Sequence, residues 1–398
     1  MTEHETTTQS LPRRAPIVSL AHAGFFLIGI VNTLLGPILP SLSARWHLDD
    51  AHAGYLFVAQ FAGCITGAAA SSPLLKRLGF QPLLTCGFAG MGLALVGLTV
   101  SPWLGGIVSV YGLGLGLGLT IPSINLLIAE VNPDRRASAL NVLNFLWGAG
   151  AVAGPPFISW LALGTDLARP LFSLAALLGC TTLLLFRSVP TGRSTAEQSP
   201  AIAEASDSRA WISPYFLLTL LLLFIYTGTE TATGGWISSF ARRLDSSSHS
   251  WAIAQSLFWA GLLLGRAVAP LVLGCISSPR LVLSGILVAA AGLGSILASG
   301  KLTALSAAAF LAGLGMGPIF PTTFAIFTER LGTQAQRLTG PVFVLTSLGG
   351  AIMPWVVGFT SARYGGLRTG LFVPLIGALA MILLQITILR VLARPRNS

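Results

Sequence analysis

The sequence predicts an all-α membrane protein with twelve transmembrane helices in two six-helix repeats. Hydrophobic residues make up 53% of the 398 residues and charged residues only 9%, and the mean hydropathy is +0.78. A soluble domain of this length does not need so apolar a composition for its core. The apolar residues fall in twelve long runs, and the second half of the chain repeats the pattern of the first.

Most of the twelve runs reach the roughly 20 residues that a helix needs to cross a bilayer. They cover residues 17–40, 51–74, 81–100, 104–129, 138–162, 168–187, 212–240, 251–275, 281–300, 302–328, 338–361 and 367–391. Spanning strands are excluded because they are short and alternate apolar with polar residues, whereas these runs are apolar on every side.

The net charge of +10 indicates the orientation of the helices. With both termini in the cytoplasm, fifteen Lys and Arg residues fall in inner loops and tails, seven in outer loops, and Arg266 within a span. This excess predicts cytoplasmic termini. The basic residues are scattered over short loops, which excludes a nucleic-acid-binding surface. No Asn-x-Ser/Thr acceptor occurs, which favours a multi-pass protein of a cell inner membrane.

The chain divides near residue 200 into two bundles. Residues 1–190 form the first, residues 191–210 a polar, Ser/Ala-rich cytoplasmic linker, and residues 211–398 the second. The halves match at a shift of about 199 residues, which predicts an internal duplication. The matched pairs are Gly29 and Gly228, Gly114 and Gly313, Gly118 and Gly317, Pro122 and Pro321, Glu130 and Glu329, and Gly150 and Gly349.

Two six-helix halves in the same orientation form a parallel repeat, and in such proteins a solute site lies between the halves. Glycines spaced by four let helices approach closely, as at Gly114 with Gly118. Polar side chains at membrane depth are the candidates for lining a solute path.

The first helix carries Asn32 between Gly29 and Gly36 and before two prolines. Glycine and proline around a polar residue predict a helix that bends beside a cavity. Gln60, in the second helix, is a further candidate for substrate contact. Packing between helices is the alternative for both side chains.

The fourth and fifth helices add an amide-rich face. Asn125 follows Pro122, while Asn141 and Asn144 share one face of the fifth helix and Trp147 lies beside it. Asparagine both donates and accepts hydrogen bonds, and an indole covers an apolar sugar face, so this face suits the recognition of hydroxyl groups. Hydrogen bonding between helices is the alternative.

Glu230, in the seventh helix, is the only carboxylate inside a long apolar run away from its ends. A charge at the bilayer centre costs roughly 2.5 to 3.5 kcal/mol on insertion scales, so such an acid marks a functional site. Tyr226 and Gly234 share its face, and Gly228 and the Gly234-Gly235 pair are expected to interrupt the helix on both sides of it. Counted from Tyr215 at 1.5 Å per residue, Glu230 lies roughly 22 Å along, in the outer half. A protonated structural acid is the alternative.

Arg266, in the eighth helix, is interpreted as a gating or structural residue near the inner helix ends, where Glu130 and Glu329 also lie. Cysteines 64, 86, 180 and 275 fall inside apolar helices, so no metal site is predicted. No catalytic triad or carboxylate pair occurs at membrane depth, so an enzyme is not expected.

These motifs resemble the major facilitator superfamily and, within it, the fucose permease-like sugar symporters. The resemblance rests on Gly36-Pro-Ile-Leu-Pro40, on Thr120-Ile-Pro-Ser-Ile-Asn125, on Asn141-Val-Leu-Asn144, on Tyr226-Thr-Gly-Thr-Glu230 and on Gly265-Arg266. It implies a secondary active transporter that moves a monosaccharide or related small polar solute by alternating access. Proton or sodium coupling through Glu230, no cofactor and a monomer in the lipid bilayer are the further expectations.

Two features depart from this family. Its acids in the first and fourth helices correspond here to Gly36 and Ile121, neither of which can carry a proton, and the loop motif is reduced to Lys76-Arg77-Leu-Gly79. Gly150-Ala-Val-Ala-Gly-Pro155 also resembles the core of the drug:proton antiporter motif. The alternative is therefore a drug/proton antiporter that exports amphipathic compounds.

Overall fold

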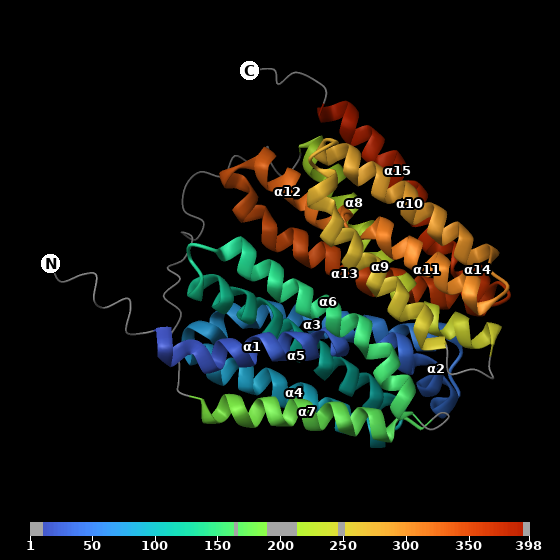
Figure 1. Ribbon diagram of the computed structural model, residues 1–398. Helices are drawn as coiled ribbons and strands as arrows, with labels where there is room; N and C mark the ends of the chain where they lie inside the picture. The colour runs from blue at the N-terminus through green and yellow to red at the C-terminus, as the bar shows by residue number, and fades with distance from the viewer. Residues whose placement is uncertain (1–10, 163–165, 189–212, 246–250, 393–398) are drawn as a thin grey trace. The chain divides into compact units, whose positions relative to one another are not determined.

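The computed structural model describes residues 11–162, 166–188, 213–245 and 251–392, all of whose regular elements are α-helices (Figure 1). The predicted linker at 191–210 lies outside these residues. The helices are α1 Leu11–Asn32, α2 Leu35–Trp46, α3 Asp50–Leu78, α4 Phe80–Val100, α5 Trp103–Val131, α6 Arg136–Leu161, α7 Ala168–Arg187, α8 Pro214–Leu244, α9 Trp251–Val272, α10 Ser278–Ala298, α11 Leu302–Met316, α12 Ile319–Leu331, α13 Thr333–Arg363, α14 Leu367–Gly370 and α15 Phe372–Leu392.

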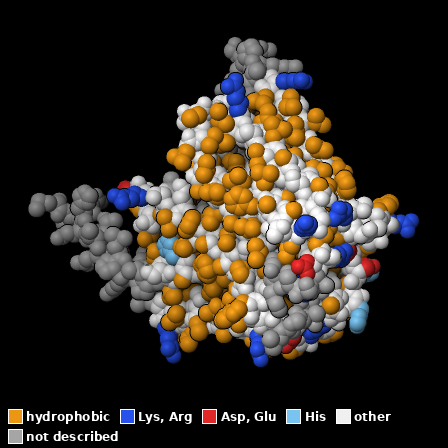
Figure 2. All heavy atoms as spheres, turned by 45° about the vertical axis from the view of Figure 1, so that its right-hand side comes forward, with side chains coloured by type: hydrophobic (Ala, Val, Ile, Leu, Met, Phe, Trp, Pro, Cys, Tyr) orange, Lys and Arg blue, Asp and Glu red, His pale blue; other side chains and the backbone are white. Residues whose placement is uncertain are grey.

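The predicted twelve spans are confirmed in the described part of the chain. Eleven spans are long and apolar enough to cross a membrane, and Ile17–Asn32 with Leu35–Trp46 form one more as a pair bent by 44°. The α11–α12 segment, Leu302–Leu331, is one of these spans. Hydrophobic side chains cover much of the face in Figure 2, and the Lys and Arg side chains lie mainly toward its edges and on its right-hand side. Such a surface suits a multi-pass membrane protein.

Contacts between Cα atoms group the chain into two units. The first comprises Met1–Leu34 and Ala59–Pro200, and the second Leu35–Val58 and Ala201–Ser398. The second unit therefore includes α2 and the first turns of α3, although these residues precede most of the first unit in the sequence.

Glycines bring the helices of the first unit into backbone contact. A Cβ atom at Gly114 of α5 would overlap the carbonyl oxygen of Gln60 of α3, and one at Gly63 would overlap the oxygen of Tyr111. In the same way, a Cβ at Gly150 of α6 would overlap the backbone of α1. Small residues are required at these positions because the helix axes lie so close together.

The second unit repeats these contacts at equivalent positions. A Cβ at Gly313 of α11 would overlap the oxygen of Phe258 of α9, and one at Gly261 would overlap the oxygen of Phe310. Gly349 of α13 lies in the same way against Phe224 of α8. The predicted duplication is thus confirmed by matching helix contacts and not only by matching residues.

The break between α1 and α2 follows from local sequence. Pro37 has no N–H, so the carbonyl of Thr33 loses the donor that a continuous helix would supply. The Leu34 N–H instead bonds to the Val31 oxygen at 3.3 Å, a tighter turn than that of an α-helix. A bend next to Asn32 was predicted, and the structure shows it there. Pro318 separates α11 from α12 for the same reason.

One expectation for the seventh span is wrong. Helix α8 is continuous over its 31 residues, through Gly228, Gly234 and Gly235. Gly228 does not interrupt the helix but lies in close contact with Met353 and Gly349 of α13. Glu230 lies one residue past the middle of α8, and its place in the outer half of the membrane stays a prediction. The helix continues to Leu244, beyond the apolar run from which the position was counted.

Candidate functional site

The second unit holds a polar cluster formed by α8 and α9. Glu230 and Tyr226 lie one turn apart on α8, and Arg266 comes from α9. Glu230 interacts electrostatically with both Tyr226 and Arg266, and Tyr226 also interacts with Arg266. Glu230 and Arg266 are half-buried and Tyr226 is 2% exposed. The acid is therefore not isolated, since a guanidinium partner offsets part of the cost of its charge in an apolar span.

Sequence spacing explains how α8 presents these groups. Residues four apart lie on one helix face, so Tyr226, Glu230 and Gly234 share the face toward α9. A Cβ at Gly234 would lie 2.7 Å from the Trp259 ring of α9. The small glycine lets α9 pack close to α8, and Arg266 comes from the same helix as Trp259.

An aromatic stripe beside this cluster was missed in the sequence. The Phe320 ring of α12 lies 6.0 Å from the Tyr226 ring and 6.0 Å from Phe324, with which it stacks. Phe343 of α13 lies 5.6 Å from Phe324. The spacing of Phe320, Phe324 and Phe327 by four and three residues along one helix was the available signal.

Gln255 of α9 occupies the space beside Gly36, where the resembled symporters carry an acid. A Cβ at Gly36 would overlap the Gln255 side-chain amide. Ser238 of α8 donates a hydrogen bond to Gln255 Oε1 at 2.6 Å, and Gln255 is fully buried. The Gln255 side chain therefore leaves room only for a glycine at position 36. An acidic side chain at position 36 would overlap the Gln255 amide.

In the first unit, the Gln60 side chain contacts the backbone of Asn32 and not its side chain. Gln60 is 4% exposed, and its Nε2 donates to the backbone oxygen of Asn32 at 3.2 Å. That oxygen lies at the end of α1, where the break leaves a carbonyl without its helical donor. Gln60 thus caps the broken helix. The Asn32 side chain is half-buried.

The other amides of the first unit lie on α5 and α6. Asn125 is half-buried and donates to the Ile121 oxygen at 2.9 Å. Asn144 is exposed and donates to the Leu140 oxygen at 2.9 Å, and Asn141, one turn before it, is also exposed. Trp147 is half-buried, with its backbone oxygen against Gly29. Each bonded amide keeps a carbonyl oxygen and a second N–H with which it can bond a solute.

Of the residues interpreted as gating groups, Arg266 and Glu329 both lie in the second unit but interact with different residues. Arg266 interacts electrostatically with Glu230 and Tyr226. Glu329 is exposed and interacts electrostatically with Tyr215, near the start of α8. Tyr215 and Tyr226 are eleven residues apart on α8, roughly 16 Å. Arg266 and Glu329 therefore have different neighbours, and their gating or structural role stays a prediction. Glu130 is half-buried in the first unit.

Among the residues that the structure describes, no three His, Cys, Asp or Glu side chains gather closely enough to hold a metal ion. The four cysteines carry free thiols.

Comparisons with known proteins agree with this architecture. The family model of the Major Facilitator Superfamily matches residues 21–340. The glucose/galactose transporter of Brucella abortus is 23% identical over 86% of this chain and 86% of its own length. The glucose/mannose transporter GlcP of Bacillus subtilis is 23% identical over 85% and 86%.

Solved structures show the same fold. The transporter FucP in its outward conformation has a TM-score of 0.63 and 18% identity, over 93% of this chain and 98% of that one. A second matching structure is that of the E. coli fucose:proton symporter FucP. Members of this family are transporters, so enzyme function is set aside. With twelve apolar spans, two glycine-packed repeats and a family match over most of its length, the chain belongs to the Major Facilitator Superfamily.

Proposed function

We propose that this protein is a secondary active transporter of a monosaccharide or a closely related polyhydroxylated solute. The two relatives named above are transporters of glucose with galactose or mannose, and they cover most of the chain. The amides and aromatic rings at membrane depth support the same class, because hydroxyl groups need partners that both donate and accept hydrogen bonds.

Recognition of the solute is assigned to Asn125, Asn141 and Asn144 with the Trp147 ring in the first unit, and to Tyr226 in the second. We keep Asn32 in this group because its side chain is half-buried. We propose that Gln60 caps α1 and does not contact the solute, because its amide bonds the free Asn32 carbonyl of another helix, whereas Asn125 and Asn144 bond only carbonyls of their own helices. Each remaining hydrogen bond to a solute hydroxyl is worth about 0.5 to 1.5 kcal/mol.

The observation that carries the coupling proposal is the position of Glu230, an acid inside the apolar span of α8, one turn from Tyr226 and in electrostatic interaction with Arg266 of α9. With Glu230 ionised, the acid and the guanidinium form a neutral pair. A proton or a sodium ion bound at Glu230 leaves the cluster with one net positive charge. It also weakens the electrostatic attraction between Glu230 and Arg266. A change of one charge inside an apolar span is large enough to favour a different conformation, because charges there are poorly solvated.

The proposal also covers the orientation of the chain in the membrane and its assembly. Both termini lie in the cytoplasm, and the protein resides as a monomer in a cell inner membrane. Cysteine labelling of intact cells at the two chain ends tests the orientation: labels that reach either end from outside contradict it.

Counterflow in proteoliposomes tests the substrate class. Vesicles loaded with unlabelled glucose, galactose, mannose, fucose or xylose should accumulate the corresponding labelled sugar, at least for one of the five. Nucleosides and lipophilic cations form the other arms of the panel. Exchange with lipophilic cations alone would favour the drug/proton antiporter, and exchange with nucleosides alone would reassign the substrate.

A matched pair of asparagines tests the site. Asn125 and Asn132 both donate to a carbonyl four residues earlier in the same stretch of chain, at 2.9 and 3.0 Å, but Asn132 follows the last residue of α5. Asn125→Ala should raise the sugar KM about three- to tenfold, the worth of one hydrogen bond. Asn132→Ala should leave the KM unchanged. Equal effects would remove Asn125 from the site.

A further inference from the structure

The segment Leu35–Val58, here called the hairpin, contains α2 and the first turns of α3 and packs within the second unit. Its α2 lies against α8 and α9. The hairpin is nevertheless continuous with the first unit at both ends, through Leu34 and Ala59. Any transport cycle that moves one unit relative to the other must therefore either carry the hairpin along or release it.

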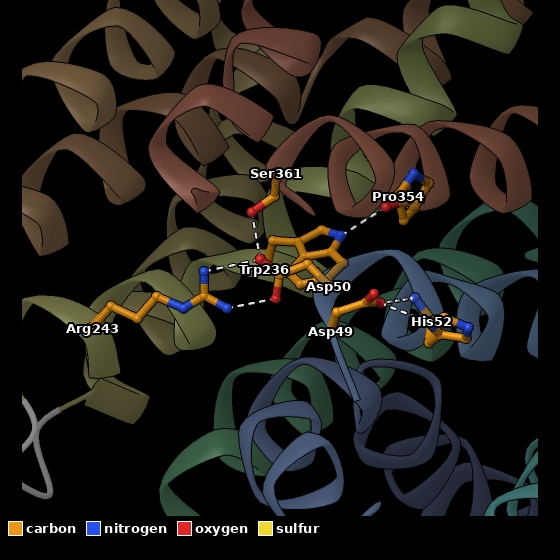
Figure 3. Close-up of polar contacts among 7 residues, drawn as sticks. All are labelled: Asp49, Asp50, His52, Trp236, Arg243, Pro354 and Ser361. Atoms are coloured by element: carbon orange, nitrogen blue, oxygen red, sulfur yellow. Dashed lines mark hydrogen bonds and ion pairs between the residues drawn. The ribbon is translucent and has the colours of Figure 1, made fainter. Parts of the chain in front are cut away.

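Asp50, at the start of α3, is the centre of the polar contacts that hold the hairpin (Figure 3). Its two carboxylate oxygens accept hydrogen bonds from the Arg243 guanidinium of α8, at 2.5 and 2.9 Å. Ser361 of α13 donates to the same carboxylate. One acid thus joins the hairpin to two helices, and its side chain is only 13% exposed. A two-point pair shielded in this way is stronger than an ordinary surface ion pair.

The helix backbones also meet at this position. A Cβ at Gly358 of α13 would overlap the backbone oxygen of Asp50, and one at Gly54 would lie 3.0 Å from the Cα of Trp355. The Tyr55 ring lies 6.1 Å from the Trp355 ring. The Asp50 contacts therefore close a fitted surface between α3 and α13.

Further contacts hold α2 itself. Arg242, next to Arg243 on α8, reaches Ser41 Oγ at 3.4 Å and lies over the Trp251 ring, 4.2 Å from its centroid. Ser41 is 1% exposed. At the opposite end of the hairpin, Leu35 follows the break after Asn32, where Gln60 caps the free carbonyl. The hairpin thus has a hinge at residues 33–34 and polar attachments near its turn.

We propose that Asp50, Arg243 and Ser361 form a latch that holds the hairpin on the second unit, and that the transport cycle opens this latch. The hairpin is released by bending at residues 33–34. Release exposes the α2 face that packs on α8, including Ser41. The latch acts whatever the solute is, so its failure and the failure of the sugar assignment are distinguishable.

Labelling of a cysteine at Ser41 by a maleimide measures release directly. In a background with the four natural cysteines replaced by serine, Ser41→Cys is a nearly isosteric reporter. With the latch intact, labelling should be slow. Asp50→Asn and Arg243→Gln should each raise the labelling rate about fivefold or more, the effect of losing one partly shielded pair.

Two controls make the result decisive. Asp49 neighbours Asp50 but contacts His52 only within its own turn, at 2.7 and 2.8 Å, so Asp49→Asn should leave the rate unchanged. A second reporter, Ser306→Cys, lies on α11 and is 7% exposed in the native structure. It should stay unlabelled in all variants. Unchanged Ser41→Cys labelling, an equal effect of Asp49→Asn, or a parallel rise at Ser306→Cys would each overturn the latch.

Discussion

Adding one methyl group to a contact glycine tests the repeated packing. In Gly114→Ala and Gly313→Ala the new Cβ overlaps a backbone oxygen of the neighbouring helix, which cannot move aside as a flexible side chain would. Overpacking of this kind costs about 1 to 3 kcal/mol. At Gly90 and Gly294, also within helices, nothing lies within 4 Å of the added methyl. There, alanine should stabilise by about 0.5 to 1 kcal/mol through helix propensity.

The two classes should therefore differ by about 1.5 to 4 kcal/mol, or roughly 5 °C in melting temperature. Thermal unfolding of the purified variants in detergent, followed by tryptophan fluorescence, measures this difference. Because Gly114 and Gly313 are equivalent by duplication, their variants should lose similar stability. Melting temperatures that rise for all four variants alike would refute close helix packing at these glycines.

Three other predictions concern single contacts. Arg266→Gln leaves Glu230 without its cationic partner and should lower the melting temperature. A double-mutant cycle with Glu230→Gln should show a coupling energy of about 1 to 3 kcal/mol. Additive effects of the two substitutions would mean that the two side chains do not interact. Gln60→Leu uncaps the Asn32 carbonyl and should cost about 1 to 3 kcal/mol of stability while leaving the sugar Kd unchanged; a weaker Kd with full stability would return Gln60 to the solute site. Asp49 caps α3 through the His52 N–H, a hydrogen bond that lowers the pKa of the Asp49 carboxyl below its ordinary 3.8. Its stabilisation is therefore present above that value and lost as the pH falls through the lowered one, so Asp49→Ala should cost about 1 kcal/mol at neutral pH and less in acid, by melting at both.

The spans and the duplication were predictable because both depend on local composition. Hydropathy marks each helix, and glycines recur wherever two axes approach closely. The bend after Asn32 was predictable for a similar reason, since Pro37 removes a specific N–H from the helix. These features do not depend on which distant residue lies opposite.

Contacts of polar side chains between helices were not predictable in the same way. Gln60 and Asn125 look alike as amides in apolar helices, but Gln60 bonds the end of α1 and Asn125 its own helix. The space beside Gly36 is filled by Gln255, more than 200 residues away in the sequence. Only the three-dimensional packing brings such groups together.

The interaction of Arg266 with Glu230 was predictable from the sequence. Glu230 is the only acid, and Arg266 the only basic residue, that lies away from the ends of a predicted span. Opposite charges at membrane depth pair with each other, because neither is solvated by lipid. The glycines of α8 carried a misleading signal, since Gly228 permits close packing on α13 and does not break the helix.

We propose above that Glu230 couples the movement of the solute to that of a cation, and one substitution tests this most directly. Proteoliposomes with Glu230→Gln should lose uptake driven by a proton or sodium gradient, while exchange of labelled for unlabelled sugar continues at close to the parent rate. Glutamine keeps the size and hydrogen bonding of the side chain but cannot carry the charge. Gradient-driven accumulation that survives in Glu230→Gln would contradict the account.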